Sequence, residues 1–143
     1  MNAKLKKILI EKINNSDWWH VPPCDPEAYK KRGKFLASTF RQAEFYGRPH
    51  DVPDRVFINN PIFGFSEKAI LKKLFPSEYR MLYSTLLKET KNWYQHRINI
   101  DARMCQKAKQ LGYDAIALIG SNGKKYLEKN KKPNSIELNV LYS

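Results

Sequence analysis

The sequence predicts an α+β protein that forms a single domain over residues 1–143. Short runs rich in β-branched and aromatic residues lie toward both ends of the chain, and about fifty residues between them have helical periodicity. No repeat, low-complexity linker or change of composition divides the chain, whose 143 residues are a typical length for one domain.

The first part of the chain alternates short helices and strands. Apolar residues at helical spacing predict a helix over residues 4–14. The aromatic and β-branched run over 17–21 is expected to form a strand, because two prolines follow it. A proline before it and a glycine after it bound a helical turn over 29–32, and a second strand is expected over 34–38.

A capped helix and a third strand come next. Thr39 is a candidate N-cap for a helix over 40–46, which a glycine ends. Two prolines and two aspartates make 48–54 a loop, and the β-branched run over 55–59 is expected to form a strand.

The second half of the chain begins with the helical region. Its expected helices, bounded by capping residues or proline, cover 67–75, 77–90 and 98–111. A continuous apolar run predicts a buried strand over 114–120. The lysine-rich stretch over 121–134 is expected to be a loop, and a last strand is expected over 135–142.

The composition restricts the class of protein. With 26 Lys and Arg against 14 Asp and Glu, the net charge is +12, which attracts nucleic acids and acidic protein surfaces. No apolar run reaches the roughly 20 residues of a membrane span, and the N-terminus lacks the pattern of a secretory signal. Cys24 and Cys105 lie far apart, which argues against a disulfide scaffold or a zinc site. The expected location is therefore the cytoplasm.

Common catalytic and cofactor motifs are absent. The sequence contains no dinucleotide fingerprint, no P-loop, no GxSxG and no HExxH. The three histidines are too scattered to suggest metal ligands, so no metal is expected.

Three candidate residues occur in a characteristic order. His20 follows two tryptophans at the end of the first strand, Tyr46 lies in the helix after the second strand, and Glu137 lies in the last strand. This order, over residues 18–142, resembles the ADP-ribosyltransferase superfamily of the diphtheria-toxin and poly-ADP-ribose-polymerase type, with its His–Tyr–Glu arrangement. The resemblance implies a small split antiparallel sheet with flanking helices, and NAD as the substrate.

The resemblance also implies roles for these residues. His20 would position the ribose, Tyr46 would stack on nicotinamide, and Glu137 would hold the ribose 2′-hydroxyl and stabilise an oxocarbenium-like transition state. Further candidates for cofactor contact are Val21, Ser38, Thr39, Phe45 and Arg55. Ser38 and Thr39 are equally candidates for capping the next helix. Arg48 and Lys34 are alternatives to Arg55 for pairing with the pyrophosphate.

The basic stretch before the last strand is the candidate for target binding. Its lysines are Lys124, Lys125, Lys129, Lys131 and Lys132. Because they favour a negatively charged partner, the expected acceptor is a nucleic acid or an acidic host protein. Ser135 stands where arginine-, asparagine- and some guanine-modifying members have Gln or Glu, so the acceptor stays open. The resemblance suggests a mono-ADP-ribosyltransferase, phage-encoded or of a minimal bacterial-toxin kind.

Two alternatives to this enzyme remain. The net charge, the many tyrosines and the tryptophans Trp18, Trp19 and Trp93 also fit a non-catalytic, basic nucleic-acid-binding module. In addition, the family's first motif is often His-Gly-Thr, whereas this chain has His20-Val21-Pro22. That departure fits an ADP-ribosyltransferase fold without activity that serves as a protein-interaction domain.

Overall fold

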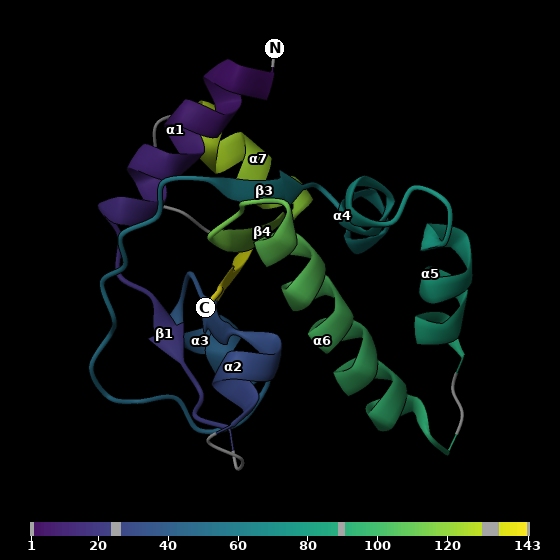
Figure 1. Cartoon of the computed structure of the whole chain (residues 1–143). Coiled ribbons are helices and arrows are strands. Elements are labelled where there is room, and N and C mark those ends of the chain that lie inside the picture. Colours follow the sequence, from purple (N-terminus) through teal and green to yellow (C-terminus); the bar gives the residue numbers. More distant parts are fainter. Residues whose placement is uncertain (1, 24–26, 89–90, 130–134, 143) are drawn as a thin grey trace.

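A five-stranded mixed sheet organises the computed structural model, which describes residues 2–23, 27–88, 91–129 and 135–142 (Figure 1). The strands are β1 (Trp19–His20), β2 (Lys34–Ala37), β3 (Pro61–Gly64), β4 (Ala115–Ile119) and β5 (Ile136–Val140). Their spatial order is β1-β2-β5-β4-β3. All neighbours pair antiparallel except β3 and β4, which are parallel. The predicted α+β class is confirmed, with one continuous sheet that includes a parallel pair.

One face of the sheet is covered by the first and last helices. Leu36, Leu138 and Ala117 stand opposite one another across β2, β5 and β4, so their side chains share a face. They belong to one buried cluster with residues of α1 (Asn2–Asn14) and α7 (Ser121–Glu128). We call this side of the sheet the α1 face.

The opposite side, the α6 face, packs on the middle of the chain. Ile62 of β3 and Ile116 of β4 form a second buried cluster with α4 (Glu67–Leu74), α5 (Tyr79–Leu87) and α6 (Trp93–Gln110). In Figure 1, α6 crosses the sheet and α4 and α5 extend to one side of it. None of the helices described here has both the length and the apolar character of a membrane span.

Two five-residue helices complete the α6 face. Helix α2 (Ala28–Arg32) contacts α6, and α3 (Phe40–Glu44) contacts β1 and β2. Trp19 of β1 packs edge-to-face on Phe40, with ring centroids 5.1 Å apart. Helix α3 therefore covers the β1–β2 side of this face. On β5, Asn139 is buried and donates to the Arg32 carbonyl of α2, whereas Glu137 stays partly exposed.

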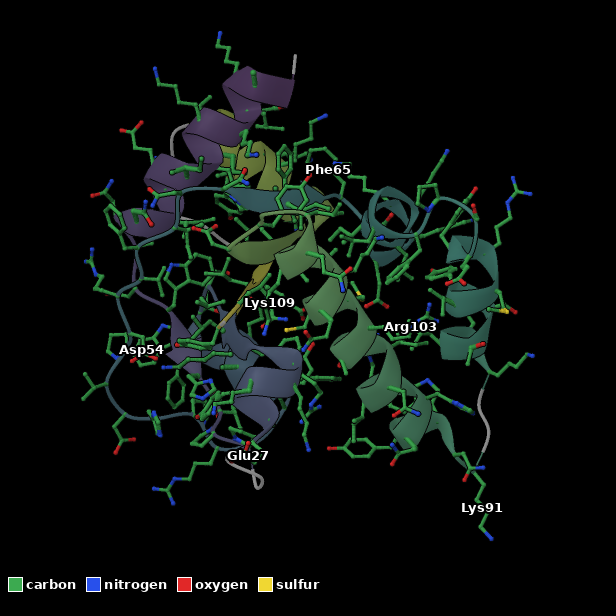
Figure 2. The ribbon with its side chains drawn as sticks, viewed as in Figure 1. Glu27, Asp54, Phe65, Lys91, Arg103 and Lys109 are labelled. Atoms are coloured by element: carbon green, nitrogen blue, oxygen red, sulfur yellow. The ribbon has the colours of Figure 1, made fainter. Side chains whose placement is uncertain are left out.

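The expected strand over 55–59 is wrong. A side chain takes the place of a strand partner there, since Asn14 accepts from the Ile58 amide at 2.7 Å and donates to its carbonyl at 2.8 Å. The backbone of Asp54, beside β1 in Figure 2, pairs instead with Trp18. The strand forms at Pro61–Gly64, where proline is tolerated because β3 lies at the sheet edge.

The expected loop over 121–134 is also wrong in its described part. Residues Ser121–Glu128 form α7, because Gly123 and Leu127, one turn apart, are both buried. Residues 130–134, which include Lys131 and Lys132, lie outside the described residues. The longest helix begins at Trp93, five residues before the expected start at residue 98.

The turn from α2 into β2 depends on a glycine. Gly33 has φ +86° and ψ −177°, a conformation that only glycine adopts readily. A Cβ there would fall 2.8 Å from the Val140 carbonyl oxygen and still closer to Asn139. We expect Gly33→Ala to lower the free energy of unfolding by at least about 2 kcal/mol.

Gly112 offers a matched control for this measurement by urea denaturation. It has φ +89°, but a Cβ would meet nothing within 4 Å. Gly112→Ala should therefore lower the free energy of unfolding by only about 1–2 kcal/mol, the strain of a positive φ in a residue with a Cβ. Equal losses in the two variants would contradict the close approach at Gly33.

Candidate active site

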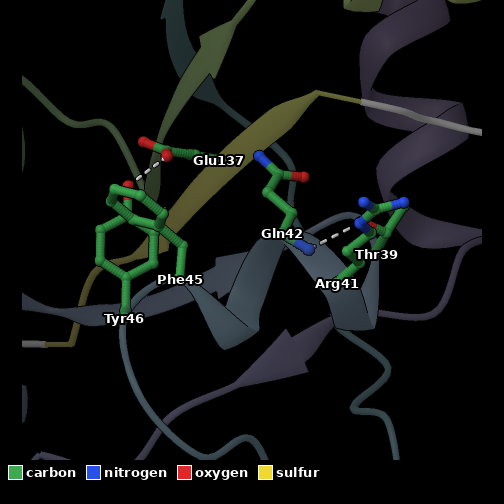
Figure 3. A pocket seen from close by; sticks show the side chains of 6 residues that line it. All are labelled: Thr39, Arg41, Gln42, Phe45, Tyr46 and Glu137. Carbon is green, nitrogen blue, oxygen red and sulfur yellow. Dashed lines mark hydrogen bonds between the residues drawn. The ribbon is translucent and has the colours of Figure 1, made fainter.

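A hydrogen bond joins Glu137 of β5 to Tyr46, two residues after α3. The Tyr46 hydroxyl donates to Glu137 Oε1 at 2.5 Å, between residues 91 positions apart in the sequence (Figure 3). Partial desolvation and then this hydrogen bond raise the pKa of Tyr46 above its ordinary value. The phenol therefore keeps its proton at neutral pH and acts as the donor.

The local structure around α3 fixes the position of Tyr46. The Thr39 hydroxyl oxygen accepts from the Gln42 amide at 3.1 Å, which confirms the predicted N-cap. At the other end of α3, the Tyr46 amide donates to the Ala43 carbonyl at 3.0 Å. Helix α3 thus holds the phenol against the sheet.

An open cavity of about 490 Å³ lies beside the Tyr46–Glu137 pair. Its lining residues are Thr39, Arg41, Gln42, Phe45, Tyr46 and Glu137 (Figure 3). Phe45 and Tyr46 are 87% and 62% exposed, and their rings meet edge-to-face at 5.4 Å. This volume is within the range of small-molecule sites, and two exposed rings offer a flat ligand a stacking surface.

Strand β5 gives Glu137 a fixed place in this wall. Glu137 stands opposite Ala37 of β2 and Leu118 of β4, so its backbone is paired on both sides. Within the described residues Glu137 Oε2 has no hydrogen-bond partner, whereas Oε1 is taken by Tyr46. One carboxylate oxygen is therefore available to a ligand.

Within the described part of the chain, Arg41 brings an unpaired positive charge to the site, whereas Arg97 stands in an ion cluster with two carboxylates. Arg41 lines the cavity, is exposed, and has no carboxylate partner among the described residues. Arg97 of α6 is held in place by donating to Glu67 at 2.8 Å and to Asp101 at 3.0 Å. The charges of Arg97 and Glu67 act on Tyr46, which places this ion cluster close to the cavity. Burial raises the pKa of Asp101 even though Arg97 opposes that shift.

The structure does not bring His20 to this cavity. Trp19 pairs with Ala37, which in turn pairs with Glu137, so these three side chains share the α6 face. The side chain of His20, the next residue, therefore points to the α1 face. His20 is 3% exposed, with Nδ1–H donating to the Phe35 carbonyl at 2.7 Å. Its Nε2 accepts from the Tyr29 hydroxyl at 2.9 Å, so both ring nitrogens have internal partners.

The remaining predicted contacts divide between the cavity and other places. Thr39 and Phe45 line the cavity. Ser38 joins β2 to β5 instead, accepting from the Ile136 amide at 3.2 Å and donating to Gln42 at 2.8 Å. Val21 lies against Gly47, outside the cavity lining.

The cations proposed for the pyrophosphate lie elsewhere. Arg55 pairs with Asp17 at 2.8 Å, and Lys34 pairs with Asp54 at 2.9 Å. The cavity is lined instead by Arg41, which is a cation, and by the neutral Gln42, neither of which was predicted from the sequence. Helical spacing could have identified both, since they stand one turn before Phe45 and Tyr46. No local pattern marks Arg97.

Of the predicted target-binding lysines that the structure describes, Lys124 and Lys125 lie on α7 and Lys129 follows its last residue. Lys124 is 5.1 Å from the Phe65 ring centroid and 3.9 Å from Glu128. Lys125 and Lys129 are exposed. Helix α7 packs on the α1 face, whereas Glu137 opens on the α6 face, so these lysines do not line the cavity.

Comparison with known proteins adds no family to this picture, because no family model, curated protein or solved structure matches the chain. A functional assignment therefore depends on the chemistry of the site.

The buried His20 should make stability depend on pH. Burial lowers the pKa of His20 below 6.5, so the unfolded chain binds a proton more readily than the folded one. The stability that neutral His20 contributes is fully present above the pKa of His20 in the unfolded chain. It is lost as the pH falls through the lower pKa of His20 in the folded protein. We expect the free energy of unfolding to fall between pH 7.5 and pH 5.5.

The control for that titration is His20→Gln, which keeps one donor and one acceptor without a titrating ring. Urea denaturation of the variant should show a smaller difference between pH 7.5 and pH 5.5. An unchanged difference would mean that His20 is not the group responsible.

Proposed function

We propose that this protein cleaves NAD at the nicotinamide–ribose bond and transfers ADP-ribose to an acidic macromolecule. One observation carries the proposal. Tyr46 and Glu137, both selected by their resemblance to the ADP-ribosyltransferases, are hydrogen-bonded to each other in the wall of an open cavity. Nothing in their separation of 91 residues requires such a contact, so the meeting is independent support.

The Glu137 carboxylate suits the charge that this reaction develops. When the bond from ribose C1′ to nicotinamide breaks, its electron pair leaves with nicotinamide and positive charge develops on the ribose. A carboxylate held by a central strand stabilises that charge without having to reorganise. The acceptor nucleophile then bonds to C1′, and its proton passes to Glu137 or to water.

Other cavity residues would hold the two ends of NAD. The exposed rings of Phe45 and Tyr46 would stack on nicotinamide, and the guanidinium of Arg41 would pair with the pyrophosphate. With His20 turned to the α1 face, the ribose hydroxyls would instead bond to Glu137 Oε2 and to the Gln42 amide. Gln42 Nε2 has no partner in the described part of the chain, because Ser38 contacts only its oxygen.

The test is the release of nicotinamide from labelled NAD, with DNA, RNA or cell lysate offered as the acceptor. We expect Glu137→Gln to slow release at least about 100-fold, because the stabilising charge is lost. Tyr46→Phe keeps the ring and removes the hydrogen bond, so we expect a smaller loss of about tenfold.

The matched control is Glu11→Gln, which removes one exposed carboxylate from α1. It should release nicotinamide at the unmodified rate. Release that no acceptor increases would indicate a glycohydrolase. No release, and no thermal shift with NAD, would refute the enzyme and leave a basic binding module.

A further inference from the structure

The outer surface of α4 and α5 combines cations with tyrosine rings. Lys68 Nζ lies 5.7 Å from the Tyr83 ring centroid, and Lys72 Nζ lies 5.7 Å from that of Tyr79. The Arg80 guanidinium carbon is 5.6 Å from the Tyr79 centroid, and its Nε donates to the Tyr79 hydroxyl at 3.1 Å. We call these five residues the cation–tyrosine face.

No carboxylate among the described residues neutralises this face. The two glutamates of the same region are taken by α6: Glu67 by Arg97, and Glu78 by Arg103, which contacts it at 2.5 Å. Figure 2 shows Arg103 reaching from α6 toward α5. Lys68, Lys72 and Arg80 are exposed and form no ion pair with a described residue. The face therefore attracts a polyanion.

The spacing of the cations suits a chain of phosphates. Lys68 and Lys72 are four residues apart on α4 and so follow one another along one side of the helix, about 6 Å apart. The row of Lys68 and Lys72 begins beside Glu67, the first residue of α4. Glu67 accepts from Arg97, and the charges of both residues act on Tyr46 of the cavity. At this same end of the row, Lys124 of α7 lies over Phe65, just before α4 begins.

We propose that the cation–tyrosine face binds single-stranded nucleic acid. The cations would bond to phosphates, and bases would stack on the rings of Tyr79 and Tyr83 as the cations move onto the phosphates. A duplex offers the same phosphates but keeps its bases stacked inside, so the tyrosines favour a single strand. That this strand is also the acceptor of ADP-ribose rests on the proposed function; the binding itself does not.

The first test measures binding of a fluorescein-labelled single-stranded oligonucleotide over a series of salt concentrations, without NAD. Lys68→Gln/Lys72→Gln/Arg80→Gln removes three phosphate contacts, so the slope of log K against log salt should shrink by about 2. Lys4→Gln/Lys7→Gln/Lys31→Gln removes the same charge from exposed positions on α1 and α2 and should leave the slope nearly unchanged. Equal changes in both variants would overturn the proposal in favour of diffuse attraction.

The second test examines the rings. Tyr79→Leu/Tyr83→Leu keeps apolar bulk against the core, and an unfolding curve checks that the variant is folded. Its affinity for the oligonucleotide should fall at least about fivefold, with the salt slope unchanged. The affinity for a poly-glutamate peptide should be weaker and insensitive to this change. Equal affinity for peptide and oligonucleotide, or an unaffected variant, would overturn the proposal and favour an acidic protein.

The two proposals fail separately. Nicotinamide release without oligonucleotide binding would refute nucleic-acid binding by the cation–tyrosine face and would leave the proposed transferase activity supported. Oligonucleotide binding that depends on the cation–tyrosine face, with no nicotinamide release, would support the binding site and refute the proposed transferase activity.

Discussion

The alternation of side chains along β5 is the constraint on which the rest of the structure depends. This strand pairs on both sides, so its residues divide strictly between two faces. Ile136 and Leu138 enter the core of the α1 face, with 0% and 1% exposure. Glu137 must then point to the α6 face. Burial of its two neighbours thus holds a carboxylate at a fixed place in the centre of the sheet.

The same constraint explains why the candidate site is built as it is. On the α6 face, Asn139 of β5 is buried beneath α2, whereas Glu137 stays partly exposed, and the cavity forms beside it. Helix α3 brings Tyr46 to the carboxylate, and α6 brings Arg97 near it. On the α1 face, His20 is part of the buried structure, with both ring nitrogens bonded within the protein.

Local chemistry made part of this predictable from the sequence. The N-cap at Thr39 could be predicted because a threonine hydroxyl precedes a helical turn. The face on which Glu137 lies could be predicted because apolar residues stand on both sides of it in the strand. The face of His20 was not predictable, because β1 has two residues and one step of register decides it. The ion cluster at Arg97 and the Asn14 contacts to Ile58 join distant segments and leave no local pattern.

The most direct test of this site is an NMR titration with NAD that follows both the backbone amides and the imidazole nitrogens. We expect shifts at the amides of Thr39, Gln42, Tyr46 and Glu137, which line the cavity. We also expect His20 to remain the Nδ1–H tautomer, with unchanged ring signals. A large change at the His20 ring would contradict a site that excludes His20, because His20 would then have left its internal partners to contact the ligand.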